Sequence, residues 1–217
     1  MTETLTPPVT LGSAARQFFS HPSPWILAGA TAAVAVGRAT VGNWNWRDAV
    51  VAAVILGLEP VTEWVIHVFL LHFRPRQVLG HRVDLYLAVK HREHHRDPKD
   101  PVLVFVPLRV LVISLAVAAV GWWVLATSHA VAFTGLLTSY AMFLLYEWTH
   151  FLIHTSYRPK SRLYRYVWRA HRLHHYRNEH YWFGVTIHLA DHVLGTFPEK
   201  DAVPVSPTAR TLGADAA

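Results

Sequence analysis

The stretch FLLYEWTHFLIHTSYRPKSRLYRYVWRAHRLHH, Phe143–His175, combines an apolar segment with two groups of histidines. Its first part completes a long apolar run, while its second part is rich in Arg and contains no acidic residue. The histidines are His150 and His154, which form H-x₃-H, and His171, His174 and His175, which form H-x₂-HH. An apolar run followed by such histidine groups predicts a metal site at the surface of a membrane.

The same arrangement occurs earlier in the chain, where His67 and His72 form H-x₄-H and His91, His94 and His95 form a second H-x₂-HH. Imidazole is the commonest neutral metal ligand and suits iron, zinc, copper and nickel. A single histidine group would be weak support for a metal site, whereas four groups predict a centre with more than one metal ion. The chain has no cysteine, which excludes thiolate ligands, iron–sulfur clusters and disulfides.

Four apolar stretches are long enough, or nearly so, for membrane-spanning helices of about 20 residues. Within a few residues they are Pro24–Val41, Ala49–Phe73, Val102–Thr127 and Ala130–Thr155. The first is the weakest candidate because Arg38 interrupts it. We therefore predict an all-α fold: an integral membrane bundle of about four transmembrane helices, with a cytosolic helical cap that carries a histidine-rich dimetal site.

We divide the chain into residues 1–22, 23–197 and 198–217. The middle segment contains the four apolar stretches and the four histidine groups, so we expect one membrane-embedded domain. The first segment has Arg16 as its only Lys or Arg and lacks the positive start and apolar core of a signal peptide, which predicts an N-terminal tail. The last segment is small, polar and proline-containing, which predicts a disordered C-terminal tail.

The chain carries 20 Lys and Arg against 14 Asp and Glu, and two basic segments follow the second and fourth apolar stretches. They are Arg74–Lys99 and Arg158–Arg177. Because positive segments remain in the cytoplasm, we predict the metal site and both termini on the cytoplasmic side. Some of these residues could also dock an acidic electron donor. Trp122 and Trp123, at the far end of the third stretch, are expected in an interfacial aromatic belt.

Helical spacing indicates how the histidines converge. Residues three or four apart share a helix face, so each H-x₂-HH group and the H-x₃-H group can point at one place. His67 and His72 are rotated by about 140° in a helix of 3.6 residues per turn, which predicts a helix end or a distortion there. Ten imidazoles shared by two ions give five each and leave the sixth position of an octahedral ion open. Iron fits such a site, whereas a tetrahedral structural zinc needs fewer ligands.

Four segments resemble the fatty acid hydroxylase/sterol desaturase superfamily, and within it the pattern is most similar to fatty acid 2-hydroxylases. They are HREHHRDP (His91–Pro98), YEWTHFLIHT (Tyr146–Thr155), HRLHHYRNEHYWFGVT (His171–Thr186) and LADHVLGT (Leu189–Thr196). The resemblance extends from about Glu63 to Thr196. It implies a centre of two iron ions, with zinc possible after isolation, that activates O₂ and hydroxylates a C–H bond of a lipid acyl chain.

The resemblance also implies the site residues and partners. The ten histidines match the ligand positions, and no catalytic residue beyond these ligands is implied. Some relatives carry a fused cytochrome b5 domain, for which 217 residues leave no room. We therefore expect electrons from a separate donor, a ferredoxin or a cytochrome b5-like protein, and we expect no nucleic-acid partner.

Two acidic residues lie close to predicted ligands along the chain. Glu63 precedes His67 by about one turn, and Glu147 precedes His150 by three residues. Each carboxylate could hold the second ring nitrogen of a ligand. The alternative is a polar contact between spans that only stabilises the bundle, and the sequence leaves both open.

A further H-x₃-H, His188 and His192, occurs where relatives often have other residues. These histidines are either spare imidazoles near the site or an extension of the metal or proton-transfer network. Asp191 could orient His188 or one of the ligand histidines.

Two alternative functions remain at this point. A desaturase, or a hydroxylase of carotenoids or sterols, would use nearly the same centre. A membrane protein that only binds metal or haem is the non-enzymatic alternative. Haem carriers place isolated histidines on facing helices, unlike the crowded groups of this chain.

Overall fold

The computed structural model describes residues 9–214, which are helical apart from one β-hairpin and the connecting loops. Its α-helices are α1 (Leu11–Phe18), α2 (Pro22–Val41), α3 (Trp46–Val65), α4 (Tyr86–Arg96), α5 (Pro101–Val104), α6 (Leu108–Leu125), α7 (His129–His154), α8 (Arg162–Tyr176) and α9 (Leu189–Val193). A π-helix at Ile66–Leu71 continues α3, and a 3₁₀ turn lies at Lys200–Ala202. The hairpin pairs β1 (Arg76–Val78) with β2 (His81–Val83) in antiparallel register.

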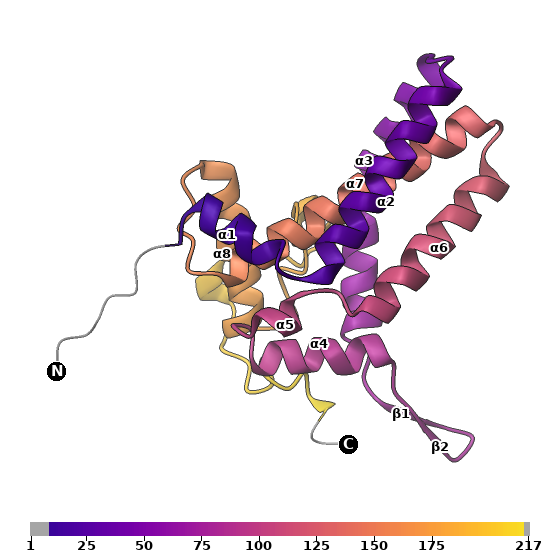
Figure 1. Ribbon diagram of the computed structural model, residues 1–217. Helices are drawn as coiled ribbons and strands as arrows, with labels where there is room; N and C mark the ends of the chain where they lie inside the picture. Colours follow the sequence, from indigo (N-terminus) through magenta and orange to yellow (C-terminus); the bar gives the residue numbers. More distant parts are fainter. Residues whose placement is uncertain (1–8, 215–217) are drawn as a thin grey trace.

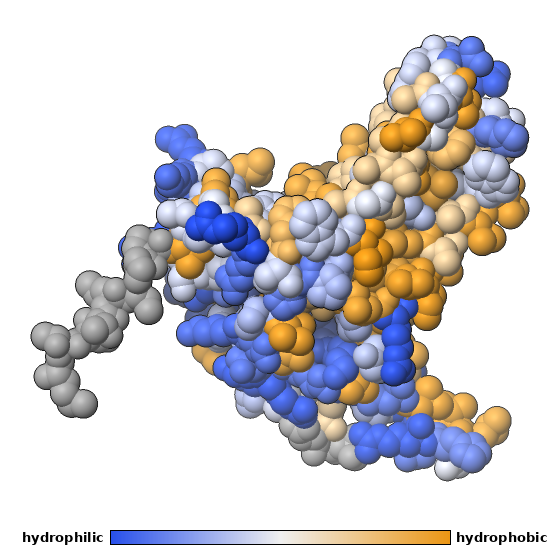
Figure 2. All heavy atoms as spheres, in the orientation of Figure 1, coloured by the Kyte–Doolittle hydropathy of each residue, from blue (hydrophilic) through white to orange (hydrophobic). Residues whose placement is uncertain are grey.

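Four helical segments are long and apolar enough to cross a membrane, as predicted: Pro22–Val41, Trp46–Leu71, Pro101–Leu125 and His129–His154. Helices α2, α3, α6 and α7 form an arm that projects away from α4, α5 and α8 (Figure 1), and the surface of this arm is largely hydrophobic (Figure 2). The chain is thus an integral membrane protein with a helical cap. The two ends of the described chain both lie at the cap end of the arm (Figure 1).

Arg38, which weakened the first predicted span, is fully buried. Its guanidinium lies 2.8 Å from the Asp48 carboxylate and donates to the Thr134 hydroxyl at 2.8 Å. These contacts join α2, α3 and α7. A charge inside a membrane segment is costly unless it is paired, so this network explains how the first span accommodates a basic residue.

The distortion that the H-x₄-H spacing requires is the π-helix at the end of α3. The backbone N–H of His72 donates to the His67 carbonyl at 3.0 Å, a bond over five residues instead of four. Such wider turns often occur at functional sites. The extra residue per turn brings His67 and His72 to the same side, with ring centroids 4.9 Å apart.

Both ends differ from the expected tails where the structure describes them. In α1, Ala14 and Phe18 are buried in a cluster with Phe105 and Phe151. At the other end, residues 198–214 pack on the cap, with Val203, Ala209 and Leu212 buried. Composition alone did not indicate this packing because a few apolar residues find a complementary surface only in the folded cap. The domain boundaries themselves stay a prediction.

Candidate metal centre

The ten predicted ligands gather in two groups of five, and within each group the candidate ligand atoms lie within 4.8 Å of one another. The first group is His67, His72, His91, His95 and His174, and the second is His94, His150, His154, His171 and His175. Helices α4 and α8 each contribute to both groups. In both H-x₂-HH segments the residues four apart join one group, and the histidine between them joins the other.

Backbone carbonyls fix the orientation of several rings. The Nδ1 atoms of His67 and His174 lie 2.5 and 2.8 Å from the carbonyls of Phe183 and Tyr181. In the same way, His95 Nδ1 lies 2.9 Å from the Ala209 carbonyl, and His150 Nδ1 lies 3.1 Å from that of Val104. A carbonyl only accepts hydrogen bonds, so these four rings carry the proton on Nδ1 and present an Nε2 lone pair.

The lone pairs point at one another. The Nε2 atoms of His67 and His95 lie 3.2 and 3.1 Å from Nε2 of His91. His91 has at most one proton there, so it can satisfy only one of these two lone pairs. In addition, Nε2 of His72, His150, His154 and His174 is buried without a hydrogen-bond partner, as are both ring nitrogens of His94. Converging buried lone pairs are the donor set of a cation, and this chemistry fits metal ions.

Several of the candidate ligands lie outside the membrane segments, and burial keeps their imidazoles neutral, which is the form that binds metal. It lowers the pKa of His174 to about 4. It also holds the pKa of His91, His95 and His175 well below the ordinary value, with their neighbouring histidines adding to the effect. Neutral imidazole is the ligand form, so these groups are ready to bind a metal at neutral pH.

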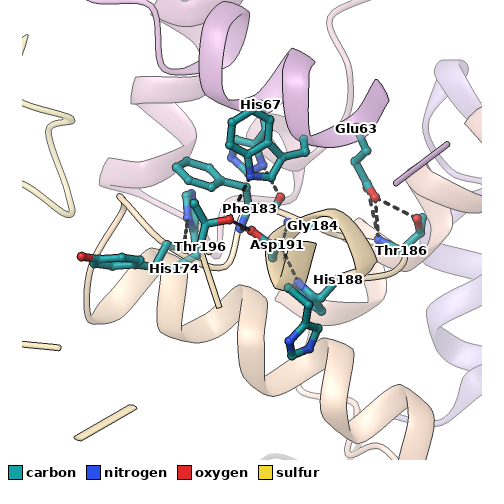
Figure 3. Close-up of polar contacts among 12 residues, drawn as sticks. Glu63, His67, His174, Phe183, Gly184, Thr186, His188, Asp191 and Thr196 are labelled. Carbon is teal, nitrogen blue, oxygen red and sulfur yellow. Dashed lines mark hydrogen bonds and ion pairs between the residues drawn. The ribbon is translucent and has the colours of Figure 1, made fainter. Parts of the chain in front are cut away.

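Asp191 organises the loop that supplies two of the carbonyls (Figure 3). Its fully buried carboxylate accepts hydrogen bonds from the backbone N–H groups of Phe183 and Gly184, at 3.0 and 2.8 Å, and from the Thr196 hydroxyl at 2.6 Å. It also contacts His188 Nδ1 at 2.9 Å. Burial raises the pKa of this carboxyl, yet the hydrogen bonds hold its pKa below the usual value. Asp191 thus holds the backbone of Phe183, whose carbonyl contacts His67.

The other predicted neighbours of the ligands have different partners. Glu63 accepts from the Thr186 backbone N–H and hydroxyl, at 3.1 and 2.8 Å (Figure 3). Glu147 accepts from the Ser23 hydroxyl and the Val106 N–H, at 3.0 and 3.1 Å. Among the described residues, neither carboxylate bonds a histidine. The structure thus places both in contacts between segments, and ligand rings use carbonyls instead.

His188 and His192 do not act as a pair. His188 is buried against Asp191, whereas the His192 Nε2 atom lies 2.6 Å from the Tyr166 hydroxyl at an exposed position. Within the part of the chain that the structure describes, neither ring contacts a histidine of the two groups. Neither histidine is therefore placed among the candidate ligands, and whether they take part in a proton-transfer network stays a prediction.

An apolar cavity of about 460 Å³ leads from the first histidine group into the membrane arm. It lies between α3, α6 and α7, and its lining includes Leu58, Leu87, Val110 and Phe143. His67 lines it as well, so the cavity adjoins one ligand of the candidate metal centre.

The sequence predicted the ten side chains but not the carbonyls that orient them. Every residue has a carbonyl, so Val104, Tyr181, Phe183 and Ala209 carry no signal in the sequence. Only the positive φ of Trp182, 57°, marks the loop between two of them as unusual, and that angle is visible only in the structure.

Comparisons with known proteins agree with this geometry. A family model described as "Fatty acid hydroxylase" matches residues 52–196. A fatty acid 2-hydroxylase of Mus musculus is 32% identical over 145 residues, which cover 65% of this chain and 38% of the mouse protein. A dihydroceramide fatty acyl 2-hydroxylase of Arabidopsis thaliana is 31% identical over 144 residues, which cover 63% of this chain and 55% of the plant protein.

The solved structure "Full length scs7p (only hydroxylase domain visible)" has a similar fold, with a TM-score of 0.65 and 22% identity. The match covers 92% of this chain and 70% of that one. The chain spans well under two thirds of the mouse and plant relatives, so the similarity concerns the membrane and histidine-rich part.

Proposed function

This chain belongs to the fatty acid hydroxylase family, and we propose that it is an O₂-dependent monooxygenase that hydroxylates a C–H bond of a lipid acyl chain. The observation that carries the proposal is the meeting of two groups of five histidines with an apolar cavity at His67. A water-soluble substrate would not need an apolar cavity inside the membrane arm. A protein that only binds metal would not need a cavity that reaches the ligands.

The proposed cofactor is a pair of iron ions. The two groups would hold one ion each, and backbone carbonyls orient four of the ten imidazoles, those of His67, His95, His150 and His174. Bound iron would supply the activation of O₂ and the oxidation of the substrate. The chain's own residues hold the ligand lone pairs in place, exclude water through burial, and guide the substrate along the cavity. Zinc could replace iron after isolation, since imidazole suits both metals.

The proposed substrate is a lipid with a long saturated chain. Along α6 the cavity extends from Val110 to Trp122, about 18 Å at 1.5 Å per residue. One leaflet of a bilayer is about 15 Å of hydrocarbon, half of the ~30 Å core. The cavity therefore accommodates one acyl chain for most of its length. The named relatives are acyl 2-hydroxylases, which favours this substrate over a carotenoid or a sterol and favours hydroxylation over desaturation.

Electrons would come from a separate acidic carrier, a ferredoxin or a cytochrome b5-like protein. On α8 the exposed cations Arg162, Arg165 and Arg169, together with Lys200, surround a depression of about 300 Å³. They form no ion pair with described residues, so their charge is available to an acidic partner. Such a donor would approach from the cytoplasm, in keeping with the predicted orientation of the basic segments.

The test is lipid mass spectrometry of cells that express the parent chain, a His174→Ala/His175→Ala variant or a control variant. The control is His129→Ala, which removes an exposed histidine outside both groups. We expect a lipid one oxygen heavier with the parent and the control, and none with the double variant. A lipid lighter by two hydrogens would instead indicate a desaturase. No change, from a folded, iron-loaded protein with a working donor, would contradict oxidation of that host's lipids.

A further inference from the structure

The face of α6 that lines the cavity changes abruptly in size along the helix. Val110, Ser114, Ala118 and Trp122 all line the cavity and follow one another at intervals of four residues, so they share one helix face. Ser114 and Ala118 are small and leave room for a ligand. Trp122, one turn beyond Ala118, is the bulkiest of the four and ends the cavity on this helix.

The indole of Trp122 is held in a fixed position between α6 and α7. Its Nε1–H donates to the Ser139 hydroxyl at 3.1 Å. On the other helix, a Cβ atom at Gly135 would lie 2.3 Å from the indole ring, which shows how closely the ring packs on the α7 backbone. Trp122 is therefore not a member of the expected aromatic belt but a wall of the cavity.

Trp123 is exposed near the far end of α6, as expected for the aromatic belt in which the sequence analysis placed both tryptophans. It is 54% exposed and stacks on His129, with ring centroids 5.1 Å apart. Two adjacent tryptophans of one helix thus have different surroundings, and only Trp122 borders the cavity. This contrast provides a matched control.

We propose that Trp122 is the depth stop of the cavity and sets the maximum length of the acyl chain. This inference rests on the proposed function, and it places the methyl end of the substrate at the indole and the oxidised carbon near His67. A saturated chain extends about 1.25 Å per carbon, from bonds of about 1.52 Å at angles of about 111°. The ~18 Å between Val110 and Trp122 thus holds about 14 carbons, and the four residues from Ala118 to Trp122, ~6 Å, correspond to about five.

Two substitutions move the stop in opposite directions. Trp122→Ala removes the wall and should admit longer chains, whereas Ala118→Leu builds a wall one turn closer to the histidines and should favour shorter ones. The enzyme in lipid nanodiscs is given an equimolar series of saturated acyl substrates, and the products are separated by chain length. We expect the long-to-short product ratio to rise at least about tenfold with Trp122→Ala and to fall by a similar factor with Ala118→Leu.

Trp123→Ala, which removes the same side chain outside the cavity, should leave the ratio unchanged. If Trp122→Ala and Ala118→Leu both give the parent's ratio, the depth stop is wrong. If Trp122→Ala does not fold, as judged by gel filtration and thermal unfolding, Ala118→Leu alone decides: an unchanged ratio overturns the inference.

A binding measurement separates failure of this inference from failure of the proposed function. Displacement of the fluorescent fatty acid cis-parinaric acid by saturated fatty acids of increasing length reports cavity depth without turnover. If the parent oxidises no lipid but the preferred competitor length still shifts in the two variants, the function is wrong and the depth stop holds. If the parent forms product but neither measurement shifts, the depth stop is wrong and the function holds.

Discussion

The Nδ1 atom of His95 lies 2.9 Å from the carbonyl oxygen of Ala209, a residue 114 positions further along the chain. This contact connects a histidine of the first group to the last part of the described chain. The C-terminal segment is therefore part of the candidate metal centre, because the carbonyl fixes the tautomer and ring direction of His95.

Ending the chain after Val205 should weaken metal binding. Without the Ala209 carbonyl, the His95 ring loses its fixed tautomer, and loss of such a contact typically costs 10–100-fold in metal affinity, as an order of magnitude. Metal content after dialysis against a graded series of chelator concentrations measures the effect. Ala209→Gly, which retains the carbonyl, is the control and should bind metal nearly like the parent. If the truncated chain retained as much metal as the parent at every chelator concentration, the segment would have no role in the centre.

Asp191→Asn should loosen the first histidine group more than the second. The amide has one acceptor oxygen instead of two, so it cannot accept all the hydrogen bonds from Phe183, Gly184, Thr196 and His188. A buried donor left without a partner costs about 1–3 kcal/mol. We expect a lower unfolding temperature and a metal content that falls from two ions toward one. Glu93→Gln, at a surface salt bridge, should change neither quantity.

Gly184→Ala should destabilise the same loop by a steric effect. A Cβ atom at this position would lie 2.6 Å from the Ile187 carbonyl oxygen and 2.9 Å from His188 Nδ1. Overpacking of this kind typically costs about 1–3 kcal/mol. The control is Gly57→Ala, where an added Cβ meets nothing within 4 Å and alanine favours the helix. In detergent, the unfolding temperature of Gly184→Ala should lie below that of the parent, and that of Gly57→Ala should lie above it. An unfolding temperature of Gly184→Ala equal to the parent's would contradict the packing described.

Acid should release the C-terminal segment from the cap. Burial raises the pKa of Glu179, but hydrogen bonds from Thr208 and Ser206 hold its pKa below the ordinary value of 4.5. Because the folded pKa is the lower one, the carboxylate stabilises the fold above pH 4.5, and this contribution is lost as the pH falls through and below 4.5. The protection factors of residues 203–214, which compare their hydrogen exchange with that of the unfolded chain at the same pH, should therefore fall in that range.

The matched variant for this pH effect is Glu179→Gln, which has no proton to gain. Its protection factors in residues 203–214 should be lower at neutral pH and should change less on acidification. The same acid response in both proteins would mean that another group controls the segment.

The ten candidate ligands and the four apolar spans could both be predicted from the sequence. Histidine spacing at His91, His94 and His95, and again at His171, His174 and His175, depends only on local helix geometry. Apolar length likewise depends only on composition. The five-residue spacing of His67 and His72 even predicted a distortion, which the structure shows as a π-helix.

The surroundings of those side chains could not be predicted from the sequence, because they arise from contacts between distant segments. Carbonyls of Phe183 and Ala209 orient His67 and His95 because distant segments pack there, and a carbonyl has no residue type by which the sequence could reveal it. For the same reason, the adjacent residues Trp122 and Trp123 look equivalent in the sequence. Their surroundings differ because the packing of α6 on α7 turns one indole toward the cavity and leaves the other exposed.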